Sequence, residues 1–179
     1  MDYNNIHREL VEDCKLGKRQ AQFELYRLYS RAMYNICLRM LKNDMDAEDL
    51  LQNSFVDIFT KLDSFRFQSS VGAWIKRIVV NNCINFLKKR RLEIQELNEQ
   101  ITEQPEPEEE DYIPKYSVES INYALFQLPD GYRVVFTLYL LEGYDHKEIA
   151  EILGISEATS KSQFSRAKKK LREIIKNQN

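Results

Sequence analysis

The sequence predicts an all-α protein of two small helical domains joined by a flexible acidic linker. Only 5 of its 179 residues are glycine and 4 are proline, whereas a sheet-rich fold uses both in its many tight turns. Apolar residues recur at helical spacing, and no strand-like alternation is present. An acidic, proline-containing block at residues 104–111 interrupts this pattern. We therefore expect a first domain over residues 1–92, a linker over 93–117 and a second domain over 118–179.

The first domain is expected to contain four helices. The first spans about residues 4–17, and a long helix with an apolar stripe follows it. The third helix begins at Asp46, which is placed to act as its N-cap. Residues 63–70 break the helical period and predict a loop, after which the fourth helix runs over about 71–92. The apolar stripe of the second helix comprises Leu25, Leu28, Tyr29, Ala32, Met33, Ile36 and Met40.

The second domain is also expected to contain four helices. The first two span about residues 118–127 and 131–141, and Pro129 separates them because proline cannot continue a helix. The last two belong to a helix-turn-helix pattern over residues 145–172.

This helix-turn-helix pattern carries two capping signals. Asp145 and Glu148 have the spacing of a capping box. A short turn with Gly154 follows, and Ser156 is placed to cap a longer helix that reaches about Lys176. The apolar side chains of that helix project on one arc, and polar and basic side chains cover the rest. This pattern is typical of a helix that reads the major groove of DNA, although a solvated basic helix would share part of it.

The fourth helix of the first domain gives a second nucleic-acid signal. Four of its polar and basic residues share one stripe, with Trp74 at the edge, and the preceding loop places Phe65 and Phe67 on either side of Arg66. Amides can read base edges, cations can hold phosphates, and aromatic rings can stack on unpaired bases. The alternative is a core tryptophan followed by a solvated basic helix end. The stripe comprises Arg77, Asn81, Asn85 and Lys88.

The start of the third helix carries more negative charge than its own N-terminus needs. Four carboxylates fall within six residues, whereas the helix dipole and the cap account for one or two. We expect a protein-binding face there. A magnesium site is not favoured, because all the carboxylates lie on one helical turn and no second carboxylate group is evident. The four residues are Asp44, Asp46, Glu48 and Asp49.

The sequence contains no recognisable catalytic, cofactor or metal motif, so we expect neither an enzyme nor a bound cofactor or metal. Cys14, Cys37 and Cys83 lie too far apart for a Cys-x-x-Cys pair and are expected to be reduced, packed side chains. No signal peptide and no membrane-spanning segment is predicted. We therefore expect a cytoplasmic protein that does not insert into membranes.

The order and spacing of several short motifs across both domains resemble bacterial extracytoplasmic-function (ECF) sigma factors, a branch of the RNA polymerase sigma factor superfamily. The resemblance covers about residues 10–92 and 118–175. The motifs are Asp46-Ala47-Glu48-Asp49-Leu50-Leu51-Gln52-Asn53-Ser54-Phe55, Trp74-Ile75-Lys76-Arg77-Ile78 with Asn81, Leu128-Pro129, Glu148-Ile149-Ala150, Ser156-Glu157-Ala158-Thr159 and Arg166-Ala167.

The resemblance implies protein partners. It assigns Asp49, Gln52 and Asn53 to the clamp helices of the largest subunit of core RNA polymerase, and it implies a further contact with the flap of the second subunit. It directs the linker toward the active-site and RNA-exit channels. It also implies an anti-sigma factor as a further partner.

The resemblance implies two contacts with promoter DNA. The loop and basic helix of the first domain bind and melt the −10 element, and the helix-turn-helix reads the −35 element. The −10 residues are Phe65, Arg66, Phe67, Gln68, Ser69, Ser70, Trp74, Arg77, Asn81, Asn85 and Lys88. The −35 residues are Thr159, Lys161, Ser162, Gln163, Ser165, Arg166 and Lys169, with Arg133 as a phosphate contact.

Two features depart from the family pattern in the base-reading stretch. Ala158-Thr159-Ser160 stands where Gly-Thr-Val is frequent, and Gln163 stands where Arg is frequent. Glutamine favours adenine where arginine favours guanine, so the preferred −35 sequence cannot be transferred from relatives.

The charge distribution predicts a factor that depends on its partner. The first domain carries a net charge of +5, the linker −8 and the second domain +1, so the isolated chain is expected to bind duplex DNA weakly. Two other classes stay open on the residues alone. One is a helix-turn-helix regulator acting without core polymerase, and the other is a DNA enzyme such as a nuclease or recombinase.

Overall fold

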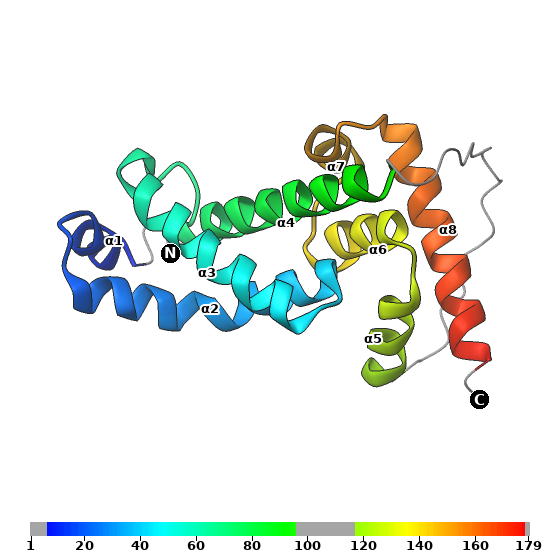
Figure 1. The fold of residues 1–179 in the computed structure, drawn as a ribbon. Helices are drawn as coiled ribbons and strands as arrows, with labels where there is room; N and C mark the ends of the chain where they lie inside the picture. The colour runs from blue at the N-terminus through cyan, green and yellow to red at the C-terminus, as the bar shows by residue number, and fades with distance from the viewer. Residues whose placement is uncertain (1–6, 96–116, 178–179) are drawn as a thin grey trace. The chain divides into compact units, whose positions relative to one another are not determined.

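The structure is a computed structural model that describes residues 7–95 and 117–177 (Figure 1). Every element assigned in these residues is helical, which confirms the all-α prediction. The chain divides into two compact units, residues 1–94 and 95–179, and each is described by itself. The predicted linker over 93–117 lies outside the described residues except at its two ends. No described helix is both long and apolar enough to cross a membrane.

The first unit is built on a helical hairpin. Helices α2 and α3 run side by side and are joined by a short turn, while α1 packs on α2 (Figure 1). A single turn of 3₁₀-helix, η2, follows α3 and leads into the loop before α4. The elements are α1 (Arg8–Lys15), α2 (Arg19–Leu41), α3 (Asp44–Lys61), η2 (Leu62–Ser64) and α4 (Val71–Gln95).

Helix α3 begins earlier than the sequence predicts. Its N-cap is Asn43, whose side-chain oxygen accepts a hydrogen bond from the Asp46 backbone N–H at 2.9 Å. The prediction of Asp46 as the cap is therefore wrong, because Asn43 offers an equally good cap. The Asp46 carboxylate lies 3.6 Å from the guanidinium of Arg90 on α4 instead.

The core of the first unit follows most of the predicted stripe on α2. Leu25, Met33 and Ile36 are buried, but Leu28 is 42% exposed, so the apolar stripe extends beyond the face that packs. Cys37 on α2 and Cys83 on α4 lie in this core with their sulfur atoms 3.8 Å apart. All three cysteines are free and buried, which confirms the expectation of reduced, packed side chains.

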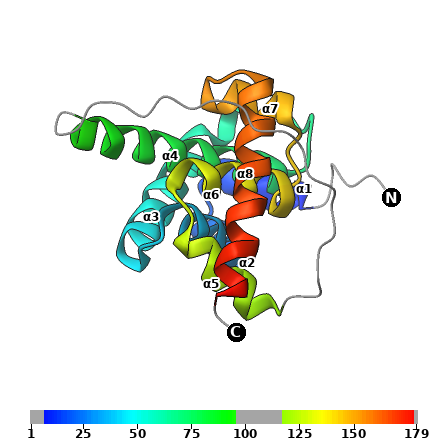
Figure 2. The ribbon, with the colours of Figure 1, turned by 90° about the vertical axis from the view of Figure 1, so that its right-hand side faces the viewer.

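In the second unit, α5 and α6 pack against α8, and α7 lies across the N-terminal end of α8 (Figure 2). The predicted helix over 131–141 forms without a break, but its second half is π-helical. There the Glu142 N–H bonds the carbonyl of Thr137 at 3.0 Å. The elements are α5 (Val118–Gln127), α6 (Asp130–Phe136), η3 (Thr137–Leu141), α7 (His146–Leu153) and α8 (Glu157–Lys176). The core comprises Ala124, Leu125, Leu128, Phe136, Ala167, Leu171 and Ile175.

Candidate nucleic-acid interface

The helix-turn-helix forms as its sequence predicts. An Asp145 carboxylate oxygen accepts a hydrogen bond from the Glu148 N–H at 2.8 Å, and the Glu148 carboxylate accepts one from the Asp145 N–H at 2.8 Å. This reciprocal pair completes the capping box of α7. Gly154 ends α7 with a φ of 71°, a left-handed conformation in which glycine has no Cβ penalty. The Ser156 hydroxyl then accepts from the Thr159 N–H at 3.0 Å and caps α8.

One hydrogen bond and a cluster of rings join α7 to α8. The Nδ1 atom of His146 lies 2.9 Å from the Ser160 hydroxyl, and Ser160 is fully buried. The His146 ring stacks on Tyr139 of η3 with 4.3 Å between centroids and meets the edge of Phe164 at 5.7 Å. Ser160 therefore orients α8 rather than reading bases. The serine that departs from the family pattern has a polar partner inside the fold. Local sequence patterns do not predict this pair, because its members lie 14 residues apart.

The environment of His146 gives a pH-dependent prediction. Burial lowers the pKa of the imidazole, and Lys161 lowers it further, against the opposing effect of Glu157 and Asp145. Folding therefore favours the neutral imidazole of His146. Its contribution to the stability of the folded protein is complete above the ordinary pKa of about 6.5, and it is lost as the pH falls from there through the lowered pKa of the folded state. Titration by NMR should place the His146 midpoint below 6.5, with the resonance assigned through a His146→Gln variant. A midpoint at or above 6.5 would contradict this placement.

All the predicted −35 residues except Arg133 lie along α8, and they differ in exposure and in their contacts within the fold. Lys161 is exposed and pairs with Glu157 at 2.8 Å, which lowers the pKa of that carboxyl. The Ser162 hydroxyl donates to the Thr159 carbonyl at 3.0 Å. Lys169 is exposed, and the others are half-buried: Thr159, Ser162, Gln163, Ser165 and Arg166.

Gln163 leans toward α6. Its amide oxygen lies 3.7 Å from the point where a Cβ on Gly131 would stand, and its two neighbouring amide atoms lie at 4.0 Å. A larger residue at position 131 would therefore meet this side chain. In this conformation the Gln163 amide packs beside the start of α6.

Arg133 does not face solvent, and the expectation of a phosphate contact is corrected. Its side chain is 1% exposed. One guanidinium nitrogen donates to the Leu128 carbonyl at 3.0 Å, and another contacts Asp130 at 2.8 Å. The guanidinium thus satisfies the carbonyl at the end of α5 and holds the turn into α6. A buried cation with these partners has no surface to offer a phosphate.

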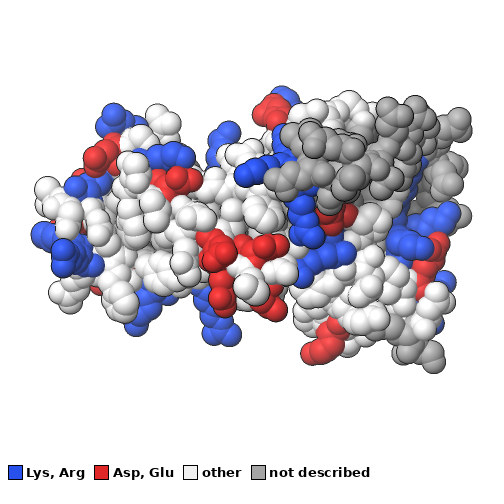
Figure 3. All heavy atoms as spheres, in the orientation of Figure 1, with Lys and Arg blue, Asp and Glu red and all other residues white. Residues whose placement is uncertain are grey.

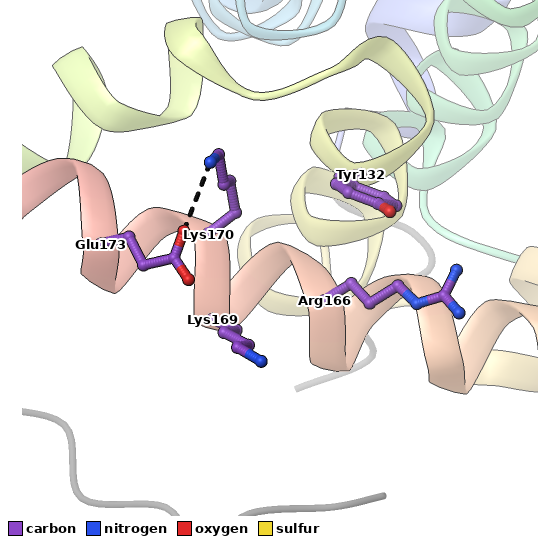
Figure 4. A pocket seen from close by; sticks show the side chains of 5 residues that line it. All are labelled: Tyr132, Arg166, Lys169, Lys170 and Glu173. Carbon is purple, nitrogen blue, oxygen red and sulfur yellow. Dashed lines mark hydrogen bonds and ion pairs between the residues drawn. The ribbon is translucent and has the colours of Figure 1, made fainter. Parts of the chain in front are cut away.

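A basic pocket of about 280 Å³ lies between α6 and α8 (Figure 4). The Tyr132 ring comes from α6, and Lys170 forms an ion pair with Glu173 at 3.3 Å. Arg166 and Lys169, both predicted to contact DNA, line the same pocket. Tyr132 and Lys170 were not predicted from the sequence, because neither belongs to the set of polar and basic residues expected to face DNA on α8. The pocket suits an anionic group such as a phosphate.

The stripe predicted on α4 lies on the surface of the first unit. Arg77, Asn81, Asn85 and Lys88 are all exposed, while their neighbours Ile75, Val79 and Cys83 are buried. Asn82 turns inward, where its amide donates to the Ser54 hydroxyl at 3.1 Å and to the Asp57 carboxylate at 3.0 Å. This inward amide fixes the rotation of α4 against α3, so that the other two asparagines face outward.

The loop before α4 divides its aromatic residues between core and surface. Phe65 is buried, which corrects the expectation that it offers a stacking surface to bases. Its ring lies 5.2 Å from Trp74 and 4.8 Å from Phe67, both half-buried. Trp74 is thus partly a core residue. Ser70 accepts a hydrogen bond from the Ala73 N–H at 3.2 Å and helps to begin α4. Arg66 and Gln68 are exposed, and Ser69 is half-buried.

Acidic side chains gather over the start of α3 (Figure 3). Along the same helix, Asp49 and Gln52 are exposed between Met45 and Val56, which are 76% and 64% exposed. These four residues follow the spacing of one helical face, with Asn53 exposed beside them. We call Met45, Asp49, Gln52 and Val56 the α3 face.

In the part of the chain that the structure describes, no cluster of His, Cys, Asp and Glu could hold a metal ion.

Comparison with known proteins identifies both units. The family models for sigma-70 region 2 and sigma-70 region 4 match residues 25–93 and 119–171. The ECF RNA polymerase sigma factor SigM of Bacillus subtilis is 30% identical, over 84% of this chain and 93% of its own. SigW of the same organism is 27% identical, over 94% and 96%.

A solved structure agrees with this match. The sigma factor RpoE of Bartonella quintana, crystallised with the anti-sigma factor NepR, is 26% identical, with a TM-score of 0.59 over 86% of this chain and 95% of its own. Both regions, their order and the near-complete coverage of the relatives point the same way. The chain belongs to the ECF sigma factors of RNA polymerase.

Proposed function

We propose that this protein binds core RNA polymerase, recognises the −10 and −35 elements of a promoter and initiates transcription. The family membership favours this function over a regulator that acts without polymerase and over a DNA enzyme. The proposal assigns no catalytic residue to the chain, because the chemistry belongs to the polymerase. We place its action in the cytoplasm, where its DNA and its polymerase are.

The α3 face is the observation that carries the proposal. Two large apolar side chains stand exposed on either side of an acid and an amide, Asp49 and Gln52, in the same unit as the outward stripe of α4. An exposed apolar patch with polar neighbours is typical of a protein contact. We assign this face, with Asn53, to the clamp helices of the largest polymerase subunit, and we expect a further contact with the flap of the second subunit.

The DNA contacts are divided between the units. In the first unit, the exposed residues of the loop and of α4 bind the −10 element, with Trp74 at the edge of that surface. In the second unit, α8 enters the major groove at the −35 element, and its later cations hold phosphates. Arg133 is left out of this set because it is buried.

An anti-sigma factor is a further proposed partner. The support is the likeness to RpoE of Bartonella quintana, which was solved in complex with NepR. Such a partner would hold the protein inactive until a signal releases it.

Retention of promoter DNA tests the proposal. Transcription in vitro, with core polymerase and fragmented genomic DNA, locates the start sites and supplies a promoter. The isolated protein should retain that duplex poorly, since two domains of net charge +5 and +1 joined by a linker of −8 neutralise few phosphates. Added core polymerase should give sharp retention and transcripts from the promoter. Tight, sequence-specific binding by the isolated protein, with no effect of polymerase, would contradict the proposal.

A further inference from the structure

Phe67 has a backbone conformation that its side chain does not favour. Its φ is 56°, in the left-handed region, which a bulky residue rarely adopts. Such a conformation persists only where the surroundings hold it in place, and it is frequent at ligand-binding sites. The residue lies in the middle of the loop over 65–70. The contacts that hold Phe67 therefore determine the shape of this loop.

Helix α1 supplies those contacts. The guanidinium carbon of Arg8 lies 4.5 Å from the centroid of the Phe67 ring, and the Lys15 ammonium lies 4.8 Å from it. Both distances are within the range of a cation–π interaction. Arg8 and Lys15 are seven residues apart and so share one face of α1.

Lys15 also fixes the backbone of the loop. Its ammonium donates a hydrogen bond to the Phe65 carbonyl at 3.0 Å, across 50 residues of sequence. The Phe65 ring is buried beneath Phe67 and against Trp74 on α4. The loop is thus held on three sides, by α1, by the core and by the start of α4.

We propose that Arg8 and Lys15 are positioning residues for −10 recognition, which hold the loop in the shape that receives an unpaired base. The inference rests on the proposed function, since it takes the loop to be the −10 contact. The anchored ring of Phe67 is half-buried under Arg8 and Lys15, while its neighbours Arg66 and Gln68 are exposed. These two exposed side chains, rather than the phenylalanines, are then the groups that meet the base. A loop shaped before binding loses less conformational freedom when the base arrives.

Three variants test this in the holoenzyme, that is, the protein bound to core polymerase. Lys15→Met removes the cation and the donor, Lys15→Arg keeps both, and Lys18→Met is the matched control. Lys18 is exposed and pairs with Asp13 at 2.7 Å, away from the loop. Promoter opening is measured by permanganate reactivity at −10 thymines, and affinity is measured for a single-stranded non-template −10 oligonucleotide.

Lys15→Met should reduce both opening and oligonucleotide affinity by about tenfold, the effect of losing one charged hydrogen bond and one cation–π contact. In both measurements, Lys15→Arg should stay within about threefold of the wild type. The control Lys18→Met should equal the wild type. Affinity for core polymerase and for −35 duplex should not change, whereas a merely structural role of Lys15 would reduce these too. Wild-type opening by Lys15→Met, or parallel loss of core binding, would overturn the inference.

The free protein gives a readout that does not depend on the polymerase. Hydrogen exchange of the backbone amides in residues 66–70 should be faster in Lys15→Met and in Arg8→Gln than in the wild type or Lys18→Met. Unchanged exchange in both variants would overturn the role of α1. If the wild-type holoenzyme opened no promoter, the proposed function would fail, and this exchange measurement would still decide whether α1 holds the loop.

Discussion

Replacing Asp49 and Gln52 together by alanine should weaken binding to core polymerase by about 100-fold, or roughly 3 kcal/mol. Both side chains are exposed on the α3 face and make no contact that the fold needs, so the unfolding midpoint should not change. Titration of labelled protein with core polymerase gives the affinity, and circular dichroism gives the stability.

The matched control is Gln20→Ala with Glu24→Ala. These residues are likewise a glutamine and a carboxylate, exposed on α2 and close in sequence. The control should bind core polymerase as the wild type does. Equal binding by the Asp49 and Gln52 variant would remove the α3 face from the interface. It would also reopen the alternative of a regulator that works without polymerase.

Replacing Arg133 by methionine should destabilise the second unit by about 2 kcal/mol. Methionine fills much of the same space but leaves the Leu128 carbonyl buried without the guanidinium that now serves it. Asp130 is largely exposed, so its carboxylate can return to water at little cost. The unfolding midpoint of a domain this small should fall by about 10 °C. Calorimetry of the full chain measures the shift, and hydrogen exchange of α6 and α8 amides assigns it.

The Arg133→Met variant also separates the structural role of Arg133 from a phosphate contact. A second variant, Arg133→Lys, keeps the charge but loses the two-pronged geometry, so its stability should lie between those of Arg133→Met and the wild type. If Arg133 contacts a phosphate, Arg133→Met should instead unfold at the wild-type midpoint. The slope of the logarithm of its promoter affinity against the logarithm of the salt concentration should then be shallower by about one. That second result would return Arg133 to the DNA surface.

The sequence determined the local structure of this protein where the chemistry of neighbouring residues is sufficient. The cap at Ser156 and the capping box of Asp145 and Glu148 formed as predicted, because both partners lie within one turn. The outward stripe of α4 followed from helical periodicity alone. The motifs in order were enough to predict the family.

The tertiary structure decided what depends on residues far apart in sequence. It buried Arg133 and Phe65, which look like binding residues when their neighbours alone are considered. It paired Ser160 with His146, and it brought Arg8 and Lys15 to the ring of Phe67. Periodicity reports which side of a helix a residue occupies, but not what lies opposite. Whether a cation is free to bind DNA depends on that opposing surface, and only the packed chain supplies it.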